Sequence, residues 1–319
     1  MEEGNDKMAQ KIEKTCKVES AYRRKQKFYK QARLAFGDVL DFLGMGEGDK
    51  ILMPAYIGWS AREGSGVFDP VKERKITPIF YHMRRNLSID VFDCKKKIDT
   101  EDAKVLLIIH YFGFVDESAK EIIAYAKEKG MTVIEDAAHA LYSDKIGRAC
   151  GCDGDYTLYS LHKMLPFSEG GVLLSNNDDL PAGITNDFYD YSQFDLSAIA
   201  EMRISNYRKI KEMLDSYNNH HVHILKSQLE PGIVPQTFPV ILTDTDRDQI
   251  YSEMNDRGWG IVSLYHTMID NLQNGDFADE CWLSKHISNL PVHQDVDESL
   301  IGEMVNDFVR IVEKYATDK

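Results

Sequence analysis

The chain has 319 residues, of which 43% are hydrophobic and 28% are charged, and its formal net charge is −14. This length allows one large and one smaller domain, and the negative charge disfavours nonspecific binding to nucleic acids or anionic membranes. The chain contains no apolar run of the roughly 18 residues that a membrane span needs, and its polar N-terminus is unlike a secretory signal. The sequence therefore predicts a cytoplasmic protein with no nucleic-acid or membrane partner.

The five cysteines are an odd and scattered set, which favours reduced thiols over a disulfide framework. Cys150 and Cys152 form the only close pair. They lack a second pair of cysteines or histidines at zinc spacing, so a zinc site is disfavoured and we predict no metal centre.

The first predicted elements follow a polar segment, residues 1–20. Apolar residues recur at helical spacing over 21–43 and predict one long amphipathic helix, which three nearby glycines end. Short apolar runs at 51–53 and 77–81 predict two strands. The loop after the first of them carries Trp59.

A strand–helix–strand unit of about 30 residues is predicted next. Residues 105–109 are an unbroken apolar run, 118–129 carry a helical pattern, and 132–134 form another apolar run. Such a unit forms a right-handed crossover in a parallel sheet, and ligands of such sheets bind beyond the carboxyl ends of the strands. His110 and Asp136 lie at two of these ends.

The remaining chain predicts two strands around a loop with Lys163, then a bridging helix and a small C-terminal α+β part. We expect a large α/β domain over residues 21–205, with a mostly parallel sheet, and the small domain over 206–319. The elements expected in the small domain are a strand at 238–242, a helix at 245–257, a strand at 260–264 and a final helix at about 298–315.

Asp136 and Lys163 supply the acid and the amine that a pyridoxal-phosphate site requires. A lysine that attacks an aldehyde must be neutral, and the mostly apolar neighbours of Lys163 favour a lowered pKa. A carboxylate opposite the pyridine nitrogen keeps that nitrogen protonated. Alone, an acid at a strand end is typical of a cap and a lysine in a loop is typical of a solvated surface. The prediction therefore depends on their joint order and spacing.

Three motifs in this region occur together in one known family. They are Val-Ile-Glu-Asp-Ala-Ala-His-Ala (133–140), Gly-Asp-Tyr-Thr-Leu-Tyr-Ser-Leu-His-Lys (154–163) and Ser-Glu-Gly-Gly (168–171). Through them the chain resembles the DegT/DnrJ/EryC1/StrS aminotransferases, which are sugar aminotransferases of the fold-type I pyridoxal-phosphate superfamily. Supporting matches lie at 46–54, 110–113 and 290–293.

The resemblance implies roles for five residues of a cofactor site. Lys163 would form the internal aldimine with pyridoxal 5′-phosphate, and Asp136 would bind the pyridine nitrogen. His139 would lie near the cofactor hydroxyl, Ser160 would contact the phosphate, and Trp59 would stack on the ring. The family also implies a homodimer.

The chain departs from the family's pattern at three places. Its lysine loop is about two residues shorter, because His162 directly precedes Lys163. The Gly-Thr that usually helps to bind phosphate is replaced by Gln-Ala-Arg at 31–33, where Arg33 is a candidate source of positive charge. The Asn-x-Arg element that members donate across the dimer is replaced by residues 189–196.

The sequence thus predicts an aminotransferase that moves an amino group from an amino acid, with glutamate as the expected donor, to a keto sugar or similar carbonyl compound. Two alternatives stay open. Some relatives are deoxysugar dehydratases with a histidine in the place of the lysine, and the adjacent His162 and Lys163 make the alignment ambiguous by one residue. The departures from the family's pattern also allow a non-catalytic relative that only binds a small molecule or a partner.

Overall fold

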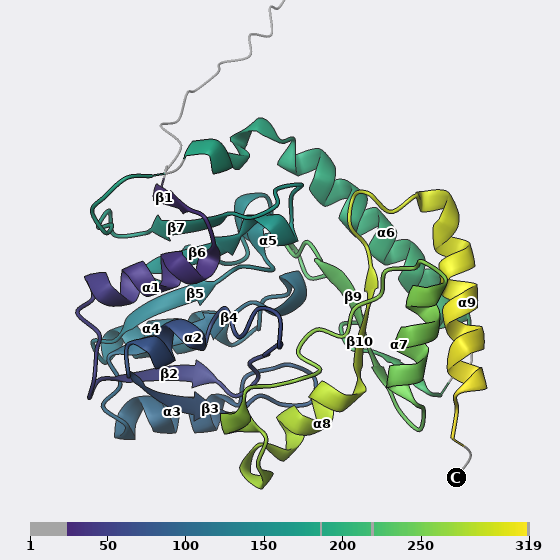
Figure 1. Ribbon diagram of the computed structural model, residues 1–319, viewed down its shortest axis with the longest axis horizontal. Helices are drawn as coiled ribbons and strands as arrows, with labels where there is room; N and C mark the ends of the chain where they lie inside the picture. The colour runs from purple at the N-terminus through teal and green to yellow at the C-terminus, as the bar shows by residue number, and fades with distance from the viewer. Residues whose placement is uncertain (1–23, 186, 218–219, 318–319) are drawn as a thin grey trace, which may run out of the picture.

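The computed structural model describes residues 24–185, 187–217 and 220–317 and contains a large and a small sheet (Figure 1). In the large sheet, the five strands from β6 to β3 are parallel, whereas β7 and β1 are antiparallel to their neighbours. In spatial order these strands are β1 (Lys25–Tyr29), β7 (Gly171–Ser175), β6 (Tyr156–Ser160), β5 (Thr132–Asp136), β4 (Val105–Ile109), β2 (Lys50–Pro54) and β3 (Thr77–Tyr81).

Helices cover the large sheet in two packed pairs. One pair is α1 (Ala32–Phe42) with α2 (Asp69–Glu73), and the other is α3 (Val91–Thr100) with α4 (Ala119–Glu128). The predicted strand–helix–strand unit is confirmed, because β4 and β5 pair in parallel on either side of α4 in the chain. All five residues of β4 are buried, as expected for an apolar strand covered on both faces.

The predicted helix over 21–43 is wrong in its first part. Residues 25–29 form β1, which pairs with β7, and α1 begins only at Ala32. Phe28 fits the helical spacing of apolar residues, but it lies opposite Val172 in the sheet and is buried there. This long-range pairing overrides the local pattern. The predicted polar segment, residues 1–20, lies outside the described residues.

The C-terminal part is built on the antiparallel order β10-β9-β8. Its helices α6 and α7 both pack against α9 (Figure 1). The bounds are α6 (Leu196–Ser216), β8 (Val222–Ile224), β9 (Thr237–Leu242), α7 (Arg247–Asp256), α8 (Ala278–His286), β10 (Ile287–Pro291) and α9 (Ile301–Lys314).

This architecture confirms the predicted fold class, a large α/β part with a mostly parallel sheet and a small C-terminal α+β part. The strand expected at 260–264 is reduced to a single bridge between Val262 and Asn289. The expected domain boundary at residue 205 lies inside α6 and stays a prediction.

Membrane-spanning helices and metal-binding clusters are both absent from the ranges that the structure describes. No helix there is long and apolar enough to cross a membrane. No three His, Cys, Asp or Glu side chains in those ranges are grouped so that they can hold a metal ion. The four cysteines in the described ranges, Cys94, Cys150, Cys152 and Cys281, are free thiols.

Candidate active site

A cavity of about 1020 Å³ opens where β5 and β6 end. The carboxyl ends of parallel strands meet at one edge of the sheet, which is where such folds bind ligands. The volume is large enough for a cofactor together with a substrate. The structure brings all six residues predicted for the site to this cavity: Arg33, Trp59, Asp136, His139, Ser160 and Lys163.

Asp136 is the last residue of β5 and is buried. Its Oδ1 accepts a hydrogen bond of 2.8 Å from the Ala138 N–H. Burial raises the pKa of Asp136, and Lys163 offsets only part of that effect. Since the carboxylate forms no ion pair with any described residue, a cation in the cavity would stabilise it. The protonated ring nitrogen of a pyridine fits this requirement.

Lys163 ends a short 3₁₀ turn after β6, and its Nζ lies 3.1 Å from His139 Nε2. The other ring nitrogen of His139, Nδ1, accepts a hydrogen bond of 3.4 Å from the Phe112 N–H. An accepting Nδ1 carries no proton, so in neutral His139 the proton is on Nε2 and points at Lys163. A neutral lysine amine, which has a lone pair, is the matching acceptor.

The surroundings of these two residues favour their neutral forms. Desolvation lowers the pKa of Lys163, although the Asp136 carboxylate opposes this. Desolvation also holds the pKa of His139 well below its usual range, and the nearby Lys163 lowers it further. Lys163 itself faces the open cavity, so its amine stays within reach of a ligand.

The burial of neutral His139 predicts a pH-dependent stability. We expect the free energy of unfolding to fall as the pH drops below about 6.5, because the unfolded chain then protonates His139 and the folded chain does not. Its depressed folded-state pKa means that this stability is present above pH 6.5 and lost below it, by up to about 1.4 kcal/mol per pH unit. Urea unfolding between pH 7 and 5 should show a shallower slope for His139→Gln. An identical slope would contradict the neutral state.

The first turn of α1 and the end of β6 form the part of the cavity best suited to a phosphate. Residues 31–33 line it, and no described side chain caps the helix there, so backbone N–H groups remain for an anion. The buried Ser160 hydroxyl lies 3.4 Å from His162 Nδ1. Arg33 is held by the Glu63 carbonyl at 2.7 Å and by Asp69 at 3.5 Å.

Trp59 lines the cavity on a loop that is tied to the C-terminal part. Its N–H donates to the Thr267 carbonyl at 2.9 Å. The neighbouring Gly58 is required, since a Cβ there would lie 2.5 Å from the Tyr265 ring. Tyr265 has a left-handed backbone, with φ of 62°, and its ring meets the His139 ring edge-on at 5.9 Å. Such strained residues are common at functional sites.

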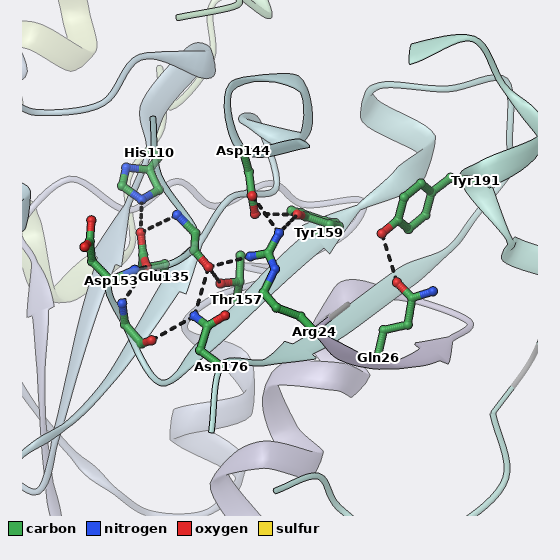
Figure 2. A network of polar contacts seen from close by, with 12 residues as sticks. Arg24, Gln26, His110, Glu135, Asp144, Asp153, Thr157, Tyr159, Asn176 and Tyr191 are labelled. Atoms are coloured by element: carbon green, nitrogen blue, oxygen red, sulfur yellow. Dashed lines mark hydrogen bonds and ion pairs between the residues drawn. The ribbon is translucent and has the colours of Figure 1, made fainter. Parts of the chain in front are cut away.

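A buried polar network supports the strand end that carries Asp136 (Figure 2). Glu135 lies 2.8 Å from His110 Nε2 and accepts N–H bonds of 2.7 Å from both Gly151 and Gly154. Burial alone would raise the pKa of Glu135, but these hydrogen bonds lower it below its usual value. His110, which we placed at a ligand-binding strand end, is thus a buried partner of Glu135 and does not line the cavity.

The lysine loop is held from two sides at the residue after Lys163. The Met164 carbonyl accepts hydrogen bonds from Tyr142 of α5 (Leu141–Lys145) at 2.8 Å and from Arg203 of α6 at 3.4 Å. The buried Arg203 also donates to the Gln236 carbonyl and to Gln294, both in the C-terminal part. These contacts connect the position of the lysine to the C-terminal part.

Sequence reasoning missed the contribution of the C-terminal part to the cavity. Arg247, Ser263 and Tyr265 line it, although they follow Lys163 by many residues. The only local signal was the capping-box-like Thr-Asp-Arg-Asp at 245–248, which predicts a helix start. The predicted helix start is confirmed, because the Asp246 side chain caps α7.

The chain is similar to known proteins over most of its length. Residues 34–186 match the DegT/DnrJ/EryC1/StrS aminotransferase family. An uncharacterized protein of Methanocaldococcus jannaschii is 22% identical, over 76% of this chain and 75% of its own. A dTDP-4-dehydro-2,3,6-trideoxy-D-glucose 4-aminotransferase of Saccharopolyspora spinosa is 23% identical, over 87% of this chain and 82% of its own.

Solved structures share the fold. A proposed sugar aminotransferase of Streptococcus pneumoniae, in its PLP form, superposes with a TM-score of 0.74 at 16% identity, over 91% of this chain and 87% of that one. At this identity the likeness establishes the fold alone. Residues 34–186, just under half of the chain, therefore match the DegT/DnrJ/EryC1/StrS aminotransferase family, and the chain shares the fold of the sugar aminotransferase of known structure.

Proposed function

We propose that the protein is a pyridoxal-phosphate-dependent aminotransferase, which takes an amino group from an amino acid, with glutamate as the expected donor, and gives it to a keto sugar or similar carbonyl compound. One observation carries the proposal: the Lys163 amine and the buried Asp136 carboxylate face the same cavity. The family match and the sugar aminotransferase among the relatives of the chain support this choice of substrates.

The residues around the cavity suit pyridoxal phosphate. Asp136 would hold the ring nitrogen, Ser160 and the first turn of α1 with Arg33 would hold the phosphate, and Trp59 would flank the ring. When bound, the cofactor supplies an aldehyde carbon that can carry the amino group and a ring that withdraws electrons.

Lys163 Nζ is the atom that holds and moves the proton. Its lowered pKa and the Nε2–H of His139 both favour a neutral amine. A neutral amine can act as a nucleophile, and it can later accept the proton of the donor's α carbon. The contacts of Met164 with Tyr142 and Arg203 keep this amine in place.

We also propose a homodimer. Ile184 and Phe188 are 95% and 75% exposed, and the Phe188 ring meets the ring of Tyr189 edge-on. Tyr189 donates a hydrogen bond to Glu169 of the cavity wall. An exposed apolar surface next to a ligand cavity is a suitable place for a second subunit. Light scattering during gel filtration would measure the mass of the particle.

Cofactor loading tests the proposed function. Incubation with pyridoxal phosphate is expected to give a yellow absorbance band, and borohydride is expected to fix the cofactor on Lys163, as mapped by peptide mass spectrometry. Lys145 is a built-in control, because burial lowers its pKa to about 8 although it lies outside the cavity. A protein that stays colourless and unlabelled would contradict the proposal.

Turnover with labelled glutamate then distinguishes an aminotransferase from a dehydratase and from a non-catalytic binding protein. Transfer of ¹⁵N to a keto sugar is the expected result. Release of a keto-deoxysugar without amine transfer would identify a dehydratase. Cofactor binding without turnover of any amino acid would identify a binding protein.

A further inference from the structure

Arg247 and Ser263 bring unused hydrogen-bond donors to the cavity from the C-terminal part of the chain. Both residues line the cavity that contains Lys163. Arg247 begins α7, and its side chain is only 11% exposed. Its Nε–H is buried and has no acceptor among the described residues. The Ser263 hydroxyl is likewise buried and finds no hydrogen-bond partner within the described chain.

The protein neutralises the guanidinium of Arg247 only in part. Its Nη2 lies 3.0 Å from Asp248 Oδ1, but the side chain of Asp248 is 81% exposed. A carboxylate that is so well hydrated gives an ion pair of little strength. A cation that has lost most of its water is stabilised by an anion or by further acceptors nearby. The site therefore favours an anionic ligand.

The other arginines of the cavity differ from Arg247 in this respect. Arg33 is occupied by the Glu63 carbonyl and by Asp69. Arg62 is exposed to solvent. Tyr251 lies four residues after Arg247 and therefore on the same face of α7, and it also lines the cavity. This face of α7 thus offers a buried cation beside an accessible aromatic ring.

We propose that Arg247, assisted by Ser263, binds a carboxylate of the amino-acid donor. The inference rests on the proposed aminotransferase function, in which every donor carries at least one carboxylate into the cavity. A guanidinium offers two parallel N–H donors that match the two oxygens of a carboxylate. The Ser263 hydroxyl adds a donor from the segment that also carries Tyr265.

Calorimetric titration of the cofactor-loaded protein with glutarate tests this site, because glutarate has the carboxylates of a donor but no amine to react. Arg247→Met is expected to weaken glutarate binding by about 10- to 100-fold, the usual effect of losing a hydrogen bond to a charged group. Ser263→Ala should weaken it by a few fold. Arg62→Met, a matched loss of an exposed arginine from the same cavity, should leave it within about twofold.

Several outcomes would overturn the assignment. These are no glutarate binding by the unsubstituted protein, equal binding by Arg247→Met, or an Arg247→Met variant that loses affinity for a nucleoside diphosphate but not for glutarate. The last result would show that Arg247 binds the phosphates of an acceptor substrate instead of a donor carboxylate. Borohydride labelling of Lys163 is measured in parallel. If labelling fails, the proposed function fails, while titration of the protein as purified still reports on Arg247.

Discussion

Replacing Lys163 by alanine is expected to lower the rate of amino transfer by at least about 10²- to 10⁴-fold. That range is the typical loss when a positioned acid–base group is removed, and the loss of a covalent nucleophile adds to it. Lys163 Nζ lies 3.1 Å from His139 Nε2. The imidazole of His139 cannot supply a primary amine in the place of the lysine. Stopped-flow absorbance with glutamate would measure the rate of the donor half-reaction.

Two controls test whether the loss of activity is specific to the amine of Lys163. Lys145→Ala removes another lysine whose pKa is lowered by burial and should leave the donor half-reaction unchanged, because Lys145 lies outside the cavity. Added methylamine should restore part of the activity of Lys163→Ala, since a small amine can enter the space left in the cavity. Full activity of the alanine variant would exclude Lys163 as the proton carrier.

The sequence was most informative where chemistry follows a strand directly. Asp136 ends a strand that its apolar pattern predicts, and Ser160 and Lys163 follow the next one, so their convergence could be expected from the parallel order. The direct contact between His139 and Lys163 was not predicted. It depends on the path of the loop after β6, which strand periodicity does not determine.

The contributions from distant parts of the chain could not be read from local patterns. The edge strand β1 exists because it pairs with β7, and the same apolar residues fit a helix equally well. Gly58 is needed only because Tyr265 packs on it. Arg247 carries the signal of a helix start and no signal of a cavity. Each of these depends on how the C-terminal part packs against the large sheet.

Asp136 is a site where function and stability oppose each other. Its pKa is raised by burial, so the folded protein holds the charged carboxylate less favourably than the unfolded chain does. The charged form therefore costs stability at neutral pH when no cation occupies the cavity. Below the ordinary carboxyl pKa of 3.8 both states are protonated, and the cost disappears.

Asp136→Asn is therefore expected to make the cofactor-free protein more stable at pH 7, by on the order of 1 kcal/mol, while lowering the donor half-reaction by about 10²- to 10³-fold. The amide can still accept the Ala138 N–H bond, but it cannot hold a positive ring nitrogen. Urea unfolding should show the stability gain at pH 7 and its loss near pH 3.5. A variant that is both less stable and fully active would show that Asp136 serves the fold rather than the cofactor.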